Sequence, residues 1–179
     1  MAEDKKFPMT IAGKEKLEEK LNHKITVDRV DITAEIQEAR SHGDLSENSE
    51  YQSAKDRQAF AEGEIKELQN ILDAVALIDP ANEPADEVTL GKKVEIQEDG
   101  DDPETFYVWG AEEIRFSNVD NTVKEQFISN ESPLGSALLH HKQGDVVTIK
   151  VPGAGISYDV KIVNVELANV AVLYPETAK

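Results

Sequence analysis

A long stretch without proline most constrains this chain, because it favours two long helices over almost any other structure. No proline occurs between Pro8 and Pro80, so the residues between them all keep the backbone N–H that helical hydrogen bonds require. Apolar residues recur along this stretch at spacings of three and four, which is the period of an amphipathic helix. Gly43 lies between two such runs, and glycine commonly ends a helix. We therefore predict a hairpin of two helices that begins at Thr10 and ends at Asp79.

The second predicted helix carries a heptad pattern, which is typical of a coiled coil. Its seam consists of Tyr51, Ala54, Gln58, Ala61, Ile65, Leu68, Leu72 and Val75. The first helix, with Thr10 as its cap, has apolar positions at Leu17, Leu21, Ile25, Ile32, Ile36 and Ala39. Because the link between the helices is short, we expect them to fold back on each other as an antiparallel coiled coil. Alanines on the seam predict a slim tip, and larger side chains predict a wider base.

Beyond the hairpin the period of the apolar pattern changes to two, as expected for strands. The predicted strands are Val88–Gln97, Thr105–Trp109, Val123–Ser129, Asp145–Val151 and Tyr158–Glu166. A short helix is predicted after Ser132 and Pro133, because serine is a good cap and proline suits the first turn.

The chain is therefore expected to contain two domains of different type. Residues 1–80 form the coiled-coil hairpin, and residues 81–87, which are polar and include a proline, form a linker. Residues 88–179 form a small antiparallel-sheet domain with one short helix, in which residues 167–179 are either a last strand or a docked extension. The predicted fold class is α+β.

The net charge limits the possible partners. Thirty-six acidic residues against 19 basic residues give a formal net charge of −17. A protein that binds the duplex backbone through its own surface needs the opposite sign, so direct DNA binding is disfavoured. The charge fits either an ordinary acidic protein or one that approaches a nucleic-acid enzyme through a basic protein surface of that enzyme.

The composition also indicates a compartment. The chain has no cysteine, which excludes disulfides and thiolate chemistry and fits a reducing cytoplasm. No apolar run approaches the ~20 residues that span a bilayer, and the N-terminal residues lack the apolar core of a signal peptide. We therefore expect a cytoplasmic monomer that makes no membrane contact.

The segment between the two helices, SHGDLSENSEY (Ser41–Tyr51), is rich in acidic and polar residues. Asp44 and Glu47 have the spacing of a capping box, in which each side chain bonds a backbone N–H at the helix start. Alternatively, the two carboxylates supply oxygen ligands for Mg²⁺, which takes one or two protein carboxylates and relies on water and substrate phosphates for the rest. Spacing alone favours the capping interpretation. A metal site here would be complete only beside another metal and a phosphate.

Two segments of the chain resemble the Gre-type bacterial transcript cleavage factors. Residues 39–55, ARSHGDLSENSEYQSAK, are similar to the family signature at the hairpin tip, with Ser49 in place of the usual alanine. Residues 128–147, ISNESPLGSALLHHKQGDVV, are similar to a second family segment that contains Ser-Pro-Leu-Gly. The two segments follow the family's order, and the similarity covers most of the chain. With this resemblance, Asp44 and Glu47 are assigned to function, and a capping role can coexist with it.

The resemblance implies a fold, a partner and a mechanism. The C-terminal domain would be similar to the FK506-binding-protein fold and dock on the rim of the secondary channel of RNA polymerase. The coiled coil would enter the channel, where Asp44 and Glu47 help hold a second Mg²⁺ and orient water for hydrolysis of backtracked RNA, as in two-metal phosphodiester chemistry. The chain would stimulate the polymerase's own cleavage activity rather than act as an enzyme, and it would bind no metal stably alone.

The same resemblance implies roles for further residues. It also identifies two positions at which this chain departs from the family pattern. The residues that would shape the tip are Ser46, Asn48 and Tyr51. The residues that would dock on the polymerase are Ser132, Pro133, Leu134 and Gly135. Glu64 stands where the family commonly has arginine, and Arg115 stands where it has an acid. We expect the Glu64 head group to lie in solvent at the edge of the seam, where it would repel RNA phosphates.

Three other functions stay open. A Gre-like paralogue would enter the same channel and inhibit the polymerase, although such paralogues alter the tip acids that are intact here. A peptidyl-prolyl isomerase would follow from the fold resemblance, but it needs an aromatic-lined apolar pocket for which the strands offer few residues. A structural coiled-coil adaptor would leave the length of the RNA unchanged.

Overall fold

The structure is a computed structural model that describes residues 6–41, 49–117 and 126–174. The chain falls into two compact units. The first unit covers Glu15–Val75 and contains most of two long helices, and the second covers Lys6–Lys14 and the residues from Ala76 onward. None of the helices in the described ranges has the length and apolar character needed to cross a membrane.

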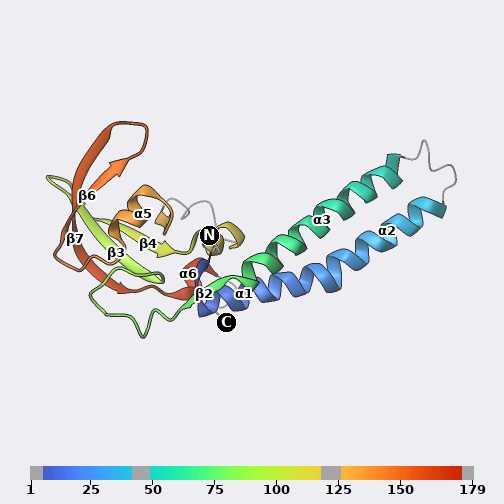
Figure 1. Ribbon diagram of the computed structural model, residues 1–179, viewed down its shortest axis with the longest axis horizontal. Helices are drawn as coiled ribbons and strands as arrows, with labels where there is room; N and C mark the ends of the chain where they lie inside the picture. The colour runs from blue at the N-terminus through green and yellow to red at the C-terminus, as the bar shows by residue number, and fades with distance from the viewer. Residues whose placement is uncertain (1–5, 42–48, 118–125, 175–179) are drawn as a thin grey trace, which may run out of the picture. The chain divides into compact units, whose positions relative to one another are not determined.

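Two helical segments form the predicted hairpin (Figure 1). They are α1 (Ile11–His23), η1 (Lys24–Asp28) and α2 (Arg29–Ser41), which follow one another without a break, and α3 (Ser49–Asp73). Helix α2 lies beside α3, which confirms that the two segments fold back on each other. Thr10 caps the first segment as predicted, because its hydroxyl accepts a hydrogen bond from the Gly13 N–H at 3.1 Å.

The segment η1 is one turn of π-helix inside the first helical segment. The N–H of Arg29 bonds to the carbonyl of Lys24, five residues earlier, so the turn holds one residue more than a regular helical turn. Leu17 and Ile32 are both buried, although they lie one residue further apart than two heptads. The π-turn absorbs this extra residue and keeps the apolar face of α1 in line with that of α2.

The predicted seam of the second helix is confirmed over most of its length, but its end is wrong. The buried seam residues are Ala54, Ala61, Ile65 and Leu68. Helix α3 ends at Asp73, and strand β2 (Val75–Ile78) follows and pairs with strand β1 (Phe7–Thr10) in a two-stranded sheet. The heptad pattern continues through Val75, but pairing with a distant segment overrides this local period. Residues 6–14 and 76–80 therefore belong to the second unit rather than to the predicted hairpin domain 1–80.

A five-stranded sheet forms the centre of the second unit. Its strands are β3 (Lys92–Glu98), β4 (Glu104–Trp109), β5 (Phe127–Ser129), β6 (Val146–Val151) and β7 (Ile156–Leu167). Their order is β5-β4-β3-β7-β6. Neighbouring strands are antiparallel except β5, which runs parallel to β4. The α+β class is confirmed, and the sheet is mixed rather than purely antiparallel.

One predicted strand begins later than expected, and the beginning of another falls outside the described residues. The predicted strand Val88–Gln97 begins only at Lys92, because Val88 exchanges backbone hydrogen bonds with the loop at His140 and His141 instead of with the sheet. The predicted strand Val123–Ser129 lies partly outside the described residues. Its described part contains β5.

The structure describes three short helices in the second unit, where the sequence pattern predicts one. Helix α5 (Pro133–Leu138) is the predicted helix. Helices α4 (Ala111–Phe116) and α6 (Val170–Leu173) have too few turns to show a clear period. After β7 the chain is a docked extension, which is one of the two predicted alternatives. An apolar cluster holds it in place and contains Trp109, Phe127, Leu173 and Tyr174.

A buried carboxylate connects the first strand to helix α4. Glu113 is fully buried, and it accepts hydrogen bonds from the N–H of Thr10 at 3.1 Å, from the Thr10 hydroxyl, and from the N–H of Gly110 at 3.2 Å. A side chain at Gly13 would clash with it, because a Cβ there would lie 2.0 Å from Glu113 Oε1. Since the same Thr10 hydroxyl caps α1, one carboxylate fixes both the end of β1 and the start of the first helix.

The burial of Glu113 predicts a pH dependence of stability. Burial raises the pKa of Glu113, and the hydrogen bonds from Thr10 and Gly110 only partly offset this effect. An acid with a raised pKa in the folded state contributes its full stability below its ordinary pKa, and that contribution is lost as the pH rises through the folded pKa. The unfolding free energy of wild type relative to Glu113→Gln should therefore fall as the pH rises above 4.5.

Urea unfolding at a series of pH values measures this difference. Glu112→Gln removes a carboxylate from the same helix, next to the buried site, and is the matched control. Glu113→Ala also leaves three donors without an acceptor and should lower the unfolding free energy by about 3 kcal/mol. A wild-type advantage over Glu113→Gln that grows with pH would contradict the argument.

Candidate functional site

The predicted tip lies mostly outside the described residues. This applies to Asp44, Ser46, Glu47 and Asn48. The structure describes both flanks of the tip, where α2 ends at Ser41 and α3 begins at Ser49. Tyr51, the fifth predicted tip residue, lies in the first turn of α3. The site is therefore built upward from its flanks.

Arg40 and Tyr51 join the two helices directly below the tip. The guanidinium carbon of Arg40 lies 5.7 Å from the centre of the Tyr51 ring, which is within the range of a cation–π contact. A hydrogen bond from Arg40 lowers the pKa of the Tyr51 hydroxyl and outweighs the opposing effect of desolvation. The Tyr51 ring packs against the apolar cluster of Ile32, Ile36, Ala54 and Ala61. One cationic and one aromatic side chain thus hold the two ends of the tip together.

Small side chains occupy the buried positions toward the tip. Ala39 of α2 and Ala54 of α3 are buried there, whereas Ile65 and Leu68 are buried further along α3 toward the base. Because an alanine side chain ends at Cβ, the hairpin carries little bulk between its helices near the tip. This gradient follows the predicted slim tip and wider base.

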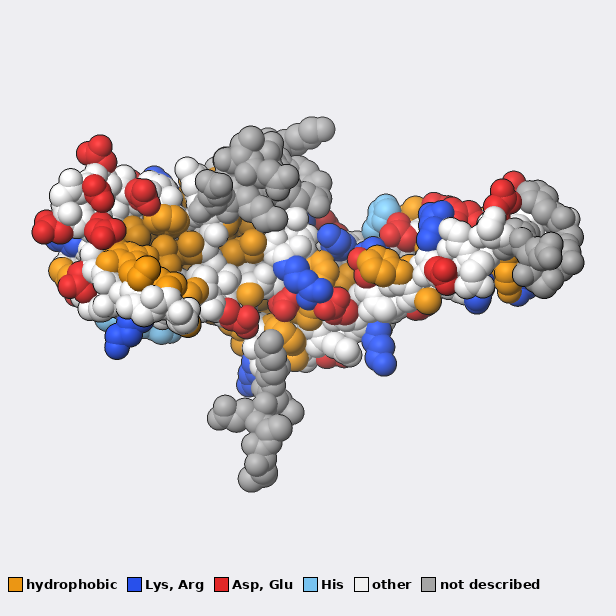
Figure 2. Space-filling model, turned by 90° about the horizontal axis from the view of Figure 1, so that it is seen from above, with side chains coloured by type: hydrophobic (Ala, Val, Ile, Leu, Met, Phe, Trp, Pro, Cys, Tyr) orange, Lys and Arg blue, Asp and Glu red, His pale blue; other side chains and the backbone are white. Residues whose placement is uncertain are grey.

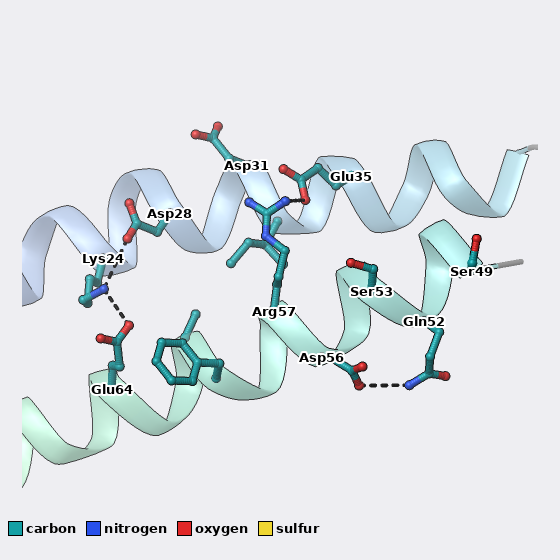
Figure 3. A pocket seen from close by; sticks show the side chains of 13 residues that line it. Lys24, Asp28, Asp31, Glu35, Ser49, Gln52, Ser53, Asp56, Arg57 and Glu64 are labelled. Carbon is teal, nitrogen blue, oxygen red and sulfur yellow. Dashed lines mark hydrogen bonds and ion pairs between the residues drawn. The ribbon is translucent and has the colours of Figure 1, made fainter.

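Among the described residues, ion pairs cross from one helix of the hairpin to the other (Figure 3 shows two of those named next). They include Lys24–Glu64 at 2.8 Å, Arg29–Glu62 at 2.7 Å and Glu35–Arg57 at 2.7 Å. From one pair to the next, the residue number of the partner on the first helix rises while that of the partner on the second helix falls, as antiparallel pairing requires. Each pair is at least partly exposed, so each contributes no more than about 1 kcal/mol. Together they favour a single register of the two helices.

The expectation for Glu64 is wrong. Its carboxylate bonds to Lys24 Nζ instead of lying free in solvent, and Lys24 Nζ also lies 3.5 Å from Asp28. Burial works against the charged form of Lys24, but Glu64 and Asp28 outweigh it and raise the Lys24 pKa. A cation in place of Glu64 would therefore meet Lys24 rather than open water.

The predicted docking residues, Ser132 to Gly135, begin helix α5. Ser132 Oγ accepts a hydrogen bond from the Gly135 N–H at 3.0 Å and donates one to the Ser129 carbonyl at 2.7 Å. Gly135 is buried, and a Cβ there would lie 2.0 Å from that carbonyl oxygen. Ser132 and Gly135 therefore have a local folding role. Leu134 packs against the core and Pro133 is exposed, so Pro133 is the member of this set that offers its side chain to a partner.

An open groove of about 780 Å³ runs along the hairpin between its two helices (Figure 3). Charged residues from both helices and the exposed Phe60 line it. The heptad pattern does not predict this groove, because most of its lining residues lie off the apolar seam. A phenylalanine off the seam of an amphipathic helix is the one sequence signal that could have indicated it. Within the described ranges, no three His, Asp or Glu side chains are grouped to hold a metal ion.

The described residues carry charged side chains of both signs on the face that Figure 2 shows. Figure 2 shows acidic and basic side chains interspersed along the hairpin. Arg115, which departs from the family pattern, pairs with Glu112 at 3.3 Å on an exposed part of α4. We find no basic face in this view that would follow a nucleic-acid backbone.

Comparison with known proteins gives matches to one family over both units. Residues 7–76 match the family described as transcription elongation factor, N-terminal, and residues 83–167 match transcription elongation factor, GreA/GreB, C-terminal. Transcription elongation factor GreA of Leuconostoc mesenteroides subsp. mesenteroides is 47% identical over 166 residues, covering 92% of this chain and 99% of the relative. GreA of Oenococcus oeni is 49% identical over 154 residues, covering 85% and 90%. A solved structure, GreA factor homolog 1 of Thermus thermophilus, is 26% identical, covers 90% of this chain and 99% of the other, and has a TM-score of 0.41.

The Lys24–Glu64 pair predicts a measurable coupling between the helices. Glu64→Lys places a cation against Lys24 and should lower the unfolding free energy by about 1 kcal/mol. Exchanging the charges, with Lys24→Glu and Glu64→Lys together, should recover most of this loss. Urea unfolding followed by the helical circular dichroism signal measures the double-mutant cycle. Lys66→Glu, which reverses an exposed charge on α3 that has no described ion-pair partner, is the control, and a cycle without coupling would contradict the pairing.

Proposed function

Because the chain belongs to the GreA/GreB family of transcription elongation factors, we propose that it acts on RNA polymerase as a transcript cleavage factor. In this proposal the hairpin enters the secondary channel of the polymerase and brings Asp44 and Glu47 to the active centre. There the two carboxylates stimulate cleavage of backtracked RNA, so that an arrested complex can resume from a new 3′ end. The observation that carries the proposal is the acidic segment Gly43–Tyr51 between two helices that Arg40 and Tyr51 join directly below it.

The hairpin has the proportions of an arm that acts at a distance from its base. Helix α3 contains 25 residues, which extend roughly 37 Å at the usual helical rise. Small buried side chains near the tip and larger ones toward the base give the arm a narrow working end. Such an arm can place two carboxylates in a confined space.

Asp44 and Glu47 fit a role beside a magnesium ion. Their carboxylate oxygens are the ligands that Mg²⁺ prefers, and one or two protein carboxylates are its usual share. Two carboxylates leave most of the coordination shell open, so the polymerase and the RNA phosphate must supply the remaining ligands. When bound there, the ion would stabilise the charge that develops at the phosphate. Asp44 and Glu47 would add negative charge and acceptor oxygens that orient the attacking water.

The chain serves in this proposal as an accessory factor, and the polymerase carries out the hydrolysis. The second unit docks on the channel rim through the segment Ser132–Gly135, where Pro133 offers an exposed side chain. A net charge of −17 supports contact with a basic protein surface rather than with nucleic acid. The factor works as a cytoplasmic monomer and binds no metal stably by itself.

Asp44→Asn and Glu47→Gln separate the proposed function from helix capping. Asparagine caps as well as aspartate, and glutamine can serve at the third position of a capping box, so both variants remove charge and keep the cap. We expect each to reduce the stimulation of cleavage roughly 10- to 100-fold, as loss of a group that supports a metal site does. The measurement is the rate of RNA shortening in a stalled polymerase complex with Mg²⁺.

The matched control is binding. The double variant Asp44→Asn with Glu47→Gln should still displace wild type from the polymerase, because the docking unit is unchanged. Full-length variants are preferable to a fragment of residues 88–179, since that fragment would leave Glu113 without its partner Thr10. Normal cleavage by either single variant would show that the residues only cap a helix, and a wild type that binds without shortening RNA would indicate an inhibitor or an adaptor.

A further inference from the structure

Phe60 is the most exposed large apolar side chain in the described ranges, with 70% of its surface accessible. It lies on α3 at the wall of the groove between the two helices. Asp56 and Glu64 stand four residues before and after it, so the three side chains share one face of the helix. An exposed aromatic ring beside an open groove contributes little to the folded core and is free to contact a partner.

The cationic side chains that line the groove already form ion pairs within the hairpin. Lys24 bonds to Glu64 at 2.8 Å, and Arg57 bonds to Glu35 at 2.7 Å (Figure 3). Both pairs join groove-lining residues to each other. Among the described residues that line the groove, these pairs leave no unpaired cationic side chain that could attract an anion.

Two carboxylates of the groove have no cationic partner in the described part of the chain. Asp56 Oδ1 accepts a hydrogen bond from the neutral amide of Gln52 at 2.9 Å, and no described donor contacts Oδ2. Asp31 lines the groove on the opposite helix and has no described ion-pair partner. The groove therefore presents a net negative charge next to the Phe60 ring.

We propose that Phe60 and Asp56 form a docking site for an arginine side chain of RNA polymerase. The inference rests on the proposed function, in which the polymerase surrounds the hairpin. A guanidinium group suits both contacts, because its planar face stacks on an aromatic ring and its N–H groups bond a carboxylate in a fork. The ring and the carboxylate lie about one helical turn apart on α3, so one arginine can reach both.

Other occupants fit this surface less well. RNA phosphates would meet the carboxylates of Asp31 and Asp56 without a free cation to offset them. A second copy of this chain, with a net charge of −17, would bring mainly like charge. Lysine has the correct charge but lacks the planar group that stacks on a ring.

Binding of the full-length protein to RNA polymerase tests the site. Phe60→Ala and Asp56→Asn should each weaken the affinity about tenfold. The affinity of the double variant should fall by less than the product of the two single-variant factors, because both groups contact the same guanidinium. Phe60→Leu, which keeps apolar area without a ring, should bind as weakly as Phe60→Ala, and Phe60→Tyr should bind as wild type does. Val30→Ala trims an exposed apolar side chain outside the groove and is the matched control.

The affinity is measured with a stalled elongation complex and with polymerase that contains no RNA. If Phe60→Ala binds the polymerase as tightly as the wild-type protein does, and the wild-type protein shortens RNA, this inference is overturned and the proposed function stays intact. A loss of affinity only when RNA is present would make RNA the occupant and would also overturn it. Phe60-dependent binding without any cleavage by wild type would support the docking site and overturn the cleavage function. Failure of wild type to bind either form would overturn both.

Discussion

The two helices of the hairpin must keep a single register, because a slip of one helix along the other would shift Ser41, where α2 ends, relative to Ser49, where α3 begins. Burial of apolar side chains such as Ile36 and Ile65 stabilises the pairing by about 1.5–3 kcal/mol for each fully buried residue. Apolar contacts discriminate poorly between neighbouring registers, however. The cross-helix ion pairs contribute less energy, but a slip would separate each cation from its carboxylate. Stability and register thus come from different side chains of the same two helices.

The base of the hairpin depends on one buried acid. Glu113 bonds to Thr10 across 103 residues of sequence, and it can approach because Gly13 has no side chain. The first turn of α1 consequently belongs to the sheet-containing unit, although the rest of that helix belongs to the hairpin. The start of the arm is set by the packing of the second unit rather than by the coiled coil.

The sequence predicts those parts of the fold that repeat a pattern or carry a local signal. The heptads predict the second long helix, the amphipathic spacing after Thr10 predicts the first, and Ser132 with Pro133 predicts α5. Strands β1 and β2 are not predicted, because each has only four residues. Val75 also continues the helical period of α3, and only the pairing of β2 with the distant strand β1 makes it part of a strand. At the site, Tyr51 falls in the predicted segment, and Asp44 and Glu47 lie outside the described residues, so their assignment stays a prediction. The pairing of Glu64 with Lys24 and the groove beside Phe60 depend on which residues face each other across the hairpin, which neither helix encodes alone.

The π-turn at Lys24–Asp28 separates two quantities that a regular helix ties together. In an α-helix each added residue both lengthens the rod and rotates its far end by about 100°. A residue absorbed in a π-turn lengthens the chain while the downstream face keeps its direction. The number of residues in the first helical segment and the direction in which its far end faces can therefore vary independently, so deletion of the absorbed residue would restore a regular helical turn without rotating the downstream face.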